Sequence, residues 1–402
     1  MDTDVLIVGG GLNGPLAALA LARIGLRSTI IDRMPRATFD AAFDGRSYAV
    51  ALGSVRMLRA MGLWDGLAET AQPITGIRAS DGRQGEGASP LHLAFDAAEI
   101  AEPFMGQMVE DRFLRPHLLA ACDAEDMVTL RFGETVVGQT AEAGQTSVTL
   151  GDGTVLSARL LLGCDGRGSA TAARAGIKRV GRTYHQTAMV CAVAHGADHG
   201  GTAHQFFMPA GPLAILPLRG NRSSIVWTET AAGATSLNAL PDAEYLEILR
   251  PRFGSFLGDI RLEGARHSYP LSLTLAARFI APRLALVGDA AHGIHPIAGQ
   301  GLNLGFRDIA ALAETLGAAK RRGDDIGAAP VLAAYERWRR FDTTAMGVAT
   351  DAVNRLFSND NPLLRLGRDL GMGAVSALPA VRRAFIREAA GLTGDVPPLM
   401  RG

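Results

Sequence analysis

The sequence has little of several features that mark particular classes of protein. Its 402 residues include only three cysteines, Cys122, Cys164 and Cys191. No two of them form a CxxC pair, so neither a disulfide framework nor a metal site is indicated. Basic and acidic residues balance at 40 each, which leaves no positive excess for binding nucleic acid. The scarcity of cysteine fits a protein of the reducing cytoplasm.

Long apolar runs and a signal peptide are also missing from the sequence. No uninterrupted apolar stretch approaches the roughly 18 residues that cross a bilayer. The first residues, MDTDVLIVGGG, carry acids where a signal peptide has basic residues, and they lead directly into a strand pattern. At 402 residues the chain exceeds one small core, so we expect two interleaved domains and a tail.

The first chemical motif follows the first predicted strand, residues 5–8. Gly9, Gly11 and Gly14 form a GxGxxG pattern ahead of an Ala/Leu-rich helix, and Asp32 ends the next strand 18 residues after Gly14. This is the spacing of a dinucleotide-binding βαβ unit. Its glycines admit the pyrophosphate, and its acid accepts hydrogen bonds from the ribose. The unit alone does not distinguish NAD from FAD.

Residues 284–316 contain a second motif that bears on this choice. Its polar and glycine residues are, in order, Gly288-Asp289, His292, His295, Pro296 and Gly299-Gln300-Gly301. A carboxylate at a strand end and glycines ahead of a helix suit a flat or anionic ligand. On spacing alone an ordinary strand-loop-helix is an equal alternative. A distant second segment favours FAD, because FAD extends across the sheet and needs further contacts for its ribityl chain and ring.

Two other segments carry candidate residues. Arg46, in Asp44-Gly45-Arg46, precedes a predicted helix and could reach a phosphate or the flavin; a surface ion pair with Asp44 is the alternative. Residues 160–163 form another apolar strand, followed by Cys164 and Asp165. We expect Cys164 to be a core residue, because nothing near it in sequence would lower its pKa.

The remaining patterns predict a β-rich region and a helical tail. Period-two alternation between residues 183 and 273 predicts a mostly antiparallel sheet, the expected wall of a substrate cavity between domains. Residues 107–119 are predicted to be helical, as is the chain after Leu316. The segment 379–390 places Val381, Phe385 and Ile386 near one face and arginines near the other. It either contacts a membrane surface or partner protein, or packs as a solvated helix on the body.

With these segments in place, the chain resembles the single-component FAD-dependent aromatic hydroxylases, and most closely the ubiquinone-biosynthesis hydroxylases. The resemblance covers nearly the whole chain. It is carried by VGGGLNG at Val8, the Asp44-Gly45-Arg46 segment, CDGRGS at Cys164, FFMPAGPLAILPL at Phe206 and VGDAAHGIHPIAGQGLNLGFRD at Val287.

The resemblance implies specific roles for individual residues. Asp289 would hold the ribityl chain, and Gly299 to Asn303 would approach the pyrophosphate and isoalloxazine. Pro296 would lie beside the reacting substrate, with His295 and Arg46 as further catalytic candidates. The candidate cofactor-binding residues are Gly9, Gly11, Asn13, Gly14, Asp32, Arg33, Arg46, Gln107, Arg112, Asp165, Asp289, Gly299, Gln300, Gly301, Leu302 and Asn303.

The chain departs from the family pattern at three places. Asp32 stands where many relatives have Glu. Ala172 stands where the family usually has an arginine, and the nearest arginine is Arg174, so no role is carried over for that side chain. The stretch from Gln107 to Asp111 replaces an aromatic residue followed by V-x-N.

The mechanism implied by the resemblance is aromatic hydroxylation. NAD(P)H, bound transiently, would reduce FAD, and O₂ would form a flavin hydroperoxide that attacks an electron-rich phenol, with the protein positioning the cofactor and keeping it dry. The sequence contains no GxSxG and no HExxH motif, so neither a serine hydrolase nor a zinc protease is indicated. His292 and His295 are expected to be structural, and His295 is the better candidate for assisting phenol deprotonation.

We therefore expect an α/β protein with a Rossmann-like FAD-binding domain, an interleaved, mostly antiparallel substrate domain and a helical C-terminal tail. The predicted divisions are 1–72, 105–180 and 282–335 for the FAD domain, 73–104 and 181–281 for the substrate domain, and 336–402 for the tail.

The expected substrate is a (poly)prenylated phenol of ubiquinone biosynthesis, with O₂ as co-substrate. Two alternatives stay open. One is a hydroxylase of a soluble phenol such as a hydroxybenzoate. The other is a non-catalytic flavoprotein subunit of a biosynthetic complex. We expect a cytoplasmic protein, and the C-terminal helices are the candidate contact with a membrane or with other quinone-biosynthesis proteins.

Overall fold

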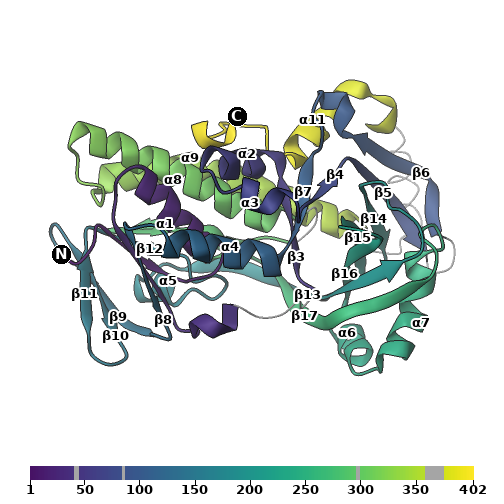
Figure 1. Ribbon diagram of the computed structural model, residues 1–402, viewed down its shortest axis with the longest axis horizontal. Helices are drawn as coiled ribbons and strands as arrows, with labels where there is room; N and C mark the ends of the chain where they lie inside the picture. Colours follow the sequence, from purple (N-terminus) through teal and green to yellow (C-terminus); the bar gives the residue numbers. More distant parts are fainter. Residues whose placement is uncertain (40–44, 84–86, 296–298, 358–374) are drawn as a thin grey trace.

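A parallel sheet forms the base of the first domain. The computed structural model describes residues 1–39, 45–83, 87–295, 299–357 and 375–402 (Figure 1). Strand order in this sheet is β18-β19-β12-β1-β2-β8. The strands are β1 (Val5–Val8), β2 (Ser28–Asp32), β8 (Val128–Phe132), β12 (Leu160–Gly163), β18 (Ile280–Ala281) and β19 (Leu284–Leu286). All pair in parallel except β18 with β19. The three central strands, β1, β12 and β19, are apolar and buried on both faces, as parallel sheets require.

Helices cover this sheet and connect its strands. They are α1 (Asn13–Arg23), α4 (Asp111–Asp123), α5 (Ala170–Arg174), α8 (Gln300–Arg322) and α9 (Ala329–Phe357). Helix α1 packs against α4 and α8, and α8 packs against α9. Lys320 Nζ, near the end of α8, donates to the carbonyl oxygens of Ile24 (2.9 Å) and Gly25 (2.5 Å) and so caps the end of α1. The predicted Rossmann-like domain is confirmed.

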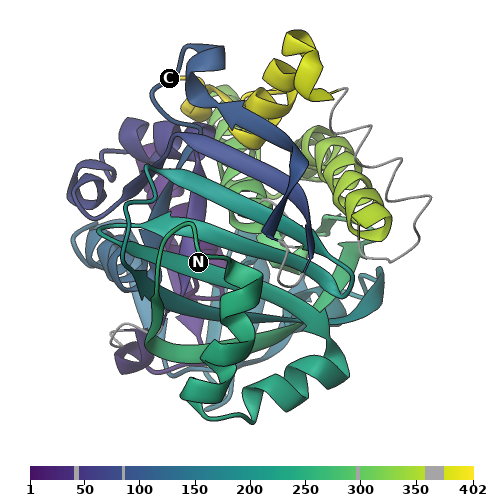
Figure 2. The ribbon, with the colours of Figure 1, turned by 90° about the vertical axis from the view of Figure 1, so that its right-hand side faces the viewer.

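A large, mostly antiparallel sheet forms the second domain, in the order β20-β17-β13-β16-β15-β14-β5-β6. Its strands are β5 (Gly76–Arg83), β6 (Gly87–Asp96), β13 (Arg179–His195), β14 (Thr202–Met208), β15 (Gly211–Leu218), β16 (Arg222–Thr230), β17 (Ile260–Ala276) and β20 (His292–Gly293). Helices α6 (Ala231–Asn238) and α7 (Asp242–Phe253) pack on it (Figure 2). Trp227, Tyr245 and Phe253 are central to that buried layer.

Two smaller sheets and several short helices complete the described chain. One sheet joins β3 (Ser47–Ala51), β7 (Gly106–Glu110) and β4 (Gln72–Ile74), and the other joins β11 (Val155–Ala158), β10 (Thr146–Leu150) and β9 (Val136–Ala141). The remaining α-helices are α2 (Leu52–Ala60), α3 (Asp65–Ala68) and α11 (Pro379–Ala389). Single-turn 3₁₀ helices lie at Arg36–Phe39, Ala97–Ile100, Gly288–Ala290 and Pro398–Met400.

The structure corrects one predicted element and places one proposed domain division inside a helix. Residues 107–110 are not helical: they belong to β7, which pairs with β3 and β4, and the helix begins at Asp111. Tertiary pairing overrides the local pattern here. Helix α9 runs continuously through residues 335 and 336, so the division proposed there falls within a helix. The domain boundaries stay a prediction.

The buried thiols agree with the sequence interpretation. Cys122, Cys164 and Cys191 are all free and buried. Burial raises the pKa of the Cys164 thiol, and the carboxylates of Asp165 and Asp308 act in the same direction. Cys164 is therefore a core residue, as predicted.

Candidate flavin-binding site

The glycine turn between β1 and α1 is tightly packed on one side and open on the other. Gly9 has φ +116°, and a Cβ on it would lie 2.4 Å from the carbonyl oxygen of Cys164. A Cβ on Gly14 would lie 1.9 Å from the oxygen of Gly9. A Cβ on Gly11 would meet no atom within 4 Å in the part of the chain that the structure describes. Two glycines are thus required by the fold, and the third leaves space where a pyrophosphate could approach the first turn of α1.

Asp32 lies beside this turn at the end of β2. Its Oδ2 accepts from the backbone N–H of Gly10 (2.5 Å) and its Oδ1 from that of Met34 (2.7 Å). Each carboxylate oxygen has a second lone pair, and the residue is partly exposed, so it can still accept from a ribose hydroxyl. The neighbouring Arg33 is exposed to solvent.

The Gly288-Asp289 turn packs directly against the start of α1. Gly288 has φ +61°, and a Cβ there would lie 2.1 Å from Asn13 Nδ2. Gly305 on α8 approaches the same amide, since a Cβ on it would lie 2.7 Å away. Asn13 Oδ1 is buried and has no hydrogen-bond partner among the described residues. An orphaned acceptor at this point fits a hydroxyl-rich cofactor chain.

A buried ionic network fixes this turn to the helices behind it. Asp308 Oδ2 accepts from the Gly288 N–H (3.0 Å) and lies 2.5 Å from His292 Nε2. Its Oδ1 accepts from Arg339 Nε of α9 (2.8 Å). The side chains of Asp308, His292 and Arg339 are 0% exposed. Burial acts to raise the pKa of Asp308, but the charges of His292 and Arg339 outweigh it and hold that pKa below its usual range.

Asp289 itself lies at the surface of the turn, with its side chain one-third exposed (33%). Its Oδ2 accepts from Arg167 Nε (3.0 Å), and its backbone oxygen accepts from Arg179 Nη2 (2.7 Å). The carboxylate is thus held by Arg167 and the backbone of the residue by Arg179, and the side chain is still accessible to a ligand. Arg167 also stacks on the Tyr269 ring at 5.6 Å.

His295 ends the described part of the same loop, and Pro296 lies outside the described residues. The imidazole is fully buried, and Tyr184 of β13 approaches it edge-on with ring centroids 5.0 Å apart. Burial, together with the nearby charge of Arg167, lowers the pKa of His295 to about 4. His295 is therefore neutral at physiological pH and has a nitrogen lone pair that can accept a proton.

The start of α8 presents a second open glycine. Gly299 caps the helix with φ +64°, and a Cβ on Gly301 would meet no atom of the described residues within 4 Å. Asn303 does not extend toward this space. Its Oδ1 accepts from Ala51 N (2.8 Å) and Ser54 Oγ (2.9 Å), and its Nδ2 donates to the carbonyls of Ala49 (2.8 Å) and Gly299 (3.1 Å). Asn303 therefore fastens α8 to β3, while Gln300 donates to Ala389 O (3.2 Å) and Leu302 is partly buried.

Two predicted residues on or beside β7 have different surroundings. Gln107 is buried, and its Oε1 has no hydrogen-bond partner among the described residues, so it offers a second acceptor to a ligand. Arg112 pairs with Glu110 (Nη2 to Oε2, 3.0 Å) and lies over the Phe113 ring.

Two further predicted residues form contacts within the protein. Arg46 is exposed and lies 3.4 Å from Asp111 (Nη2 to Oδ2); the alternative partner, Asp44, falls outside the described residues. Asp165 caps α5, accepting from Ser169 Oγ (2.5 Å) and Thr171 N (2.9 Å).

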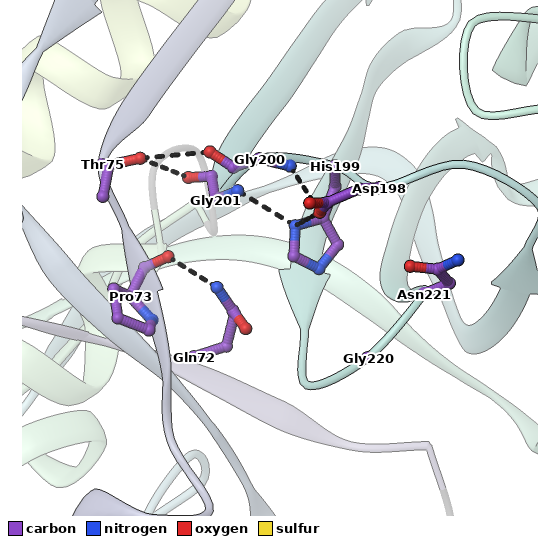
Figure 3. A pocket seen from close by; sticks show the side chains of 9 residues that line it. All are labelled: Gln72, Pro73, Thr75, Asp198, His199, Gly200, Gly201, Gly220 and Asn221. Atoms are coloured by element: carbon purple, nitrogen blue, oxygen red, sulfur yellow. Dashed lines mark hydrogen bonds and ion pairs between the residues drawn. The ribbon is translucent and has the colours of Figure 1, made fainter.

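An open hollow elsewhere on the surface is not this site. It measures about 470 Å³ and is lined by Gln72, Pro73, Thr75, Asp198, His199, Gly200, Gly201, Gly220 and Asn221 (Figure 3). None of the predicted site residues lines it. His199 Nδ1 accepts from the Gly201 N–H (3.0 Å), so its Nε2 donates to Leu218 O (2.7 Å). Both ring nitrogens serve the fold.

The comparisons with known proteins agree with this geometry. The chain matches the FAD binding domain family over residues 2–346. It is 47% identical over 403 residues to the ubiquinone hydroxylase UbiL of Rhodospirillum rubrum, covering 99% of this chain and 92% of that one. It is 36% identical over 392 residues to the 3-demethoxyubiquinol 3-hydroxylase of Escherichia coli K12, covering 97% and 99%. The p-nitrophenol 4-monooxygenase PnpA of Pseudomonas putida shares the fold, with a TM-score of 0.81 at 20% identity over 98% of both chains.

Fold and site thus define an FAD-dependent monooxygenase. Within that class, the extent of the sequence match is decisive, since it runs through nearly all of both chains. The chain belongs to the family of FAD-dependent hydroxylases of ubiquinone biosynthesis.

Several residues of the site were not predicted from the sequence. Arg167, Arg179, Asp308 and Arg339 all contact the Gly288-Asp289 turn or its anchors. The only sequence signal for a role of Arg167 in this site is weak: Asp165-Gly166-Arg167 comes shortly after a buried strand. Arg339 lies in a helical tail whose pattern indicates nothing about the flavin site.

Proposed function

We propose that the protein hydroxylates the aromatic ring of a prenylated phenol in ubiquinone biosynthesis, using O₂, with NAD(P)H as transient reductant. The observation that carries this proposal is the near full-length similarity to a ubiquinone hydroxylase and to a 3-demethoxyubiquinol 3-hydroxylase. Both names specify ring hydroxylation of quinone precursors or quinones.

The described residues fit FAD. The open faces at Gly11 and Gly301 leave room for its pyrophosphate and ring, and the start of α8 adds a preference for negative charge of roughly 0.3–1 kcal/mol. The orphaned oxygens of Asn13 and Gln107 would accept from its hydroxyl and N–H groups, with Asp32 on the ribose and Asp289 on the ribityl chain. When bound, FAD supplies the redox chemistry that activates O₂.

The protein's own part in the chemistry is positioning and proton handling. His295 would assist deprotonation of a phenol that lies beside Pro296, as the family resemblance implies; burial keeps it in its neutral form and also makes it a weaker base than a free imidazole. Arg46, exposed at the edge of β3, would contact the cofactor. These roles follow from the family resemblance together with the observed positions of His295 and Arg46.

The inner surface of the large sheet favours an apolar substrate. Met189 and Cys191 of β13 pack with α7, so the alternating residues Ala188, Val190 and Ala192 face the opposite side. Their cross-strand partners on that side include Val226, Ala214, Thr228, Ser224 and Leu216. On this side the rows through Ala188 and Val190 have uncharged partners on β16, whereas the row through Ala192 continues to Glu263 of β17, which pairs with Arg222 (2.5 Å). The uncharged part of this surface suits a prenyl chain better than the carboxylate of a hydroxybenzoate.

The test is the quinone content of cells that lack this protein. We expect accumulation of a prenylated precursor that lacks one hydroxyl group, and its structure would identify the ring position. Unchanged quinone would refute the assignment. Purified holoprotein that binds FAD but shows no phenol-dependent NAD(P)H oxidation would favour the non-catalytic subunit.

The predicted contact through the C-terminal helices also stays a proposal. On α11, Phe385 is 53% exposed, but Ile386 is buried in the core, so the expected shared apolar face of these two residues is not formed. The described helices include none that is both long and apolar enough to cross a bilayer.

A further inference from the structure

The outer face of α9 carries an unusual row of exposed apolar side chains. Phe341, Ala345, Val348, Ala352 and Leu356 recur at intervals of three and four residues, which places them on one face of a helix. Phe341 is 78% exposed, Val348 63% and Leu356 43%. We call these five residues the α9 stripe. A row of this kind marks an interaction surface, whereas single exposed apolar residues do not.

The inner face of the same helix is fixed to the body of the protein. Arg339 pairs with Asp308, as described above. Gly347 packs against Leu273 and against Ile294, the neighbour of His295: a Cβ on it would lie 3.5 Å and 3.8 Å from their side chains. Further along, Asn354 donates to Gln186 Oε1 (3.1 Å), and Phe357 stacks on Phe207 with centroids 4.1 Å apart. The stripe is therefore the outside of a firmly held wall beside the His295 loop.

The charges of α9 are distributed unevenly between its two faces. Its acids are engaged inward: Asp342 with Arg339 (3.0 Å) and Arg307 (3.4 Å), and Asp351 with Arg182. Glu336 accepts from the Phe279 N–H (2.7 Å). Among the described side chains of α9, the exposed charged residues are Arg337 and Arg340, which adjoin Phe341. For the described side chains, the outer face thus combines an apolar row with positive charge and no exposed acid.

We infer that the α9 stripe docks the enzyme on the surface of an anionic lipid bilayer. Apolar side chains with flanking arginines match the boundary between acyl chains and anionic headgroups. A second copy of the chain would instead present the same cationic surface, which offers no complementary charge. Figure 2 shows α9 at one margin of the large sheet, and its inner face contacts β15 and β17.

Docking through α9 would bring the His295 loop within one helix diameter of the lipid. This inference rests on the proposed function, because only a prenylated substrate resides in the membrane. It identifies the bilayer as the source of that substrate and α9 as the side from which the substrate enters.

The test measures co-sedimentation of the FAD-loaded protein with vesicles of phosphatidylcholine alone or containing phosphatidylglycerol. We expect binding to the anionic vesicles, weakened by salt. Phe341→Ser with Val348→Ser should reduce partitioning by at least about tenfold. Arg337→Gln with Arg340→Gln should reduce it by about fivefold per arginine. The matched control for the apolar residues is Val137→Ser with Val155→Ser, since these valines are similarly exposed on β9 and β11. The matched control for the arginines is Arg321→Gln on α8. Both control proteins should bind vesicles as the parent does.

Each variant is also assayed with a short-chain, water-soluble prenylphenol, whose hydroxylation the stripe variants should leave unchanged. Hydroxylation without vesicle binding would overturn the docking and leave the proposed function intact. Vesicle binding that depends on the stripe, without any phenol hydroxylation, would support docking and reject the function. A dimer that dissociates in the Phe341→Ser, Val348→Ser protein, with no vesicle binding by the parent, would assign the stripe to a second copy and overturn the inference.

Discussion

Asp289 and Asp308 illustrate how two nearby carboxylates serve different purposes. Asp289 is partly exposed and pairs with an accessible arginine, so its contribution to folding is small. Asp308 is fully buried between His292 and Arg339, where loss of its charge would leave a buried guanidinium with one partner fewer. We propose that the first carboxylate binds the cofactor, whereas the second holds the turn that carries the first.

We predict that Asp289→Ala folds normally but binds FAD at least about tenfold more weakly, since a hydrogen bond to a charged group contributes about 1.5–3 kcal/mol. Asp308→Asn should instead lower the free energy of unfolding of the apoprotein by about 3 kcal/mol or more, and weaken FAD binding as a consequence. Urea unfolding and FAD titration of both variants distinguish these outcomes. A yellow, fully loaded Asp289→Ala protein would contradict the assigned role.

The stability of the protein should depend on pH through His295. The pKa of His295 falls from 6.5 to about 4 on folding, so between these values the unfolded chain binds more protons. The stabilising contribution is complete above pH 6.5 and is lost as the pH falls toward 4, by an amount on the order of 3 kcal/mol. The free energy of unfolding of His295→Gln should therefore depend less steeply on pH across this window. An equal slope in both proteins would show that His295 is not buried in its neutral form.

The two glycine-led helices, α1 and α8, contact each other and each present an open glycine, Gly11 and Gly301. Their first turns are held by different means: α1 by the close approach of Gly14 to Gly9, and α8 by the four hydrogen bonds of Asn303. The positive ends of both helices would favour the anionic cofactor that we propose to bind here.

The glycines of α1 give a matched pair of variants. Gly11→Ala should fold, because its Cβ would meet no atom of the described residues within 4 Å, yet lose FAD affinity by tenfold or more, on the order of 1.4 kcal/mol. Gly14→Ala should destabilise the apoprotein by about 2 kcal/mol or more, because its Cβ would lie 1.9 Å from the Gly9 oxygen. Thermal unfolding of the two apoproteins, with FAD titration, measures both effects. Equal FAD affinity in Gly11→Ala and the parent would exclude a cofactor from this turn.

Elements with local signals were predictable from the sequence, and elements defined by distant partners were not. The βαβ unit at Gly9–Asp32 and the strand before Gly288 have continuous apolar runs bounded by glycines. Residues 107–110 were predicted as helix because their strand partners, β3 and β4, are separated from them in sequence by more than 30 residues. The contact between Arg339 and Asp308 could not be predicted from the sequence either, because no local pattern relates α9 to α8.

At the scale of the whole molecule, the fold brings three separated segments to one place. Helix α1, the Gly288-Asp289 turn and β3, which pairs with β7, come from separate parts of the chain and all contact α8, and β15 of the large sheet contacts β7. Helix α9 links the two domains, because it packs on α8 and also on β15 and β17. Its Arg339 holds Asp308, which accepts from the backbone of the Gly288-Asp289 turn. The α9 stripe on its outer face is the proposed contact with lipid.

The most direct test of the central claim is the fate of isotopically labelled O₂ in the purified holoprotein supplied with NAD(P)H and a prenylated phenol. We predict that one labelled oxygen atom appears on the phenol ring and that NAD(P)H oxidation depends on the phenol. Oxidation that is unaffected by the phenol, with no label in any organic product, would contradict the account.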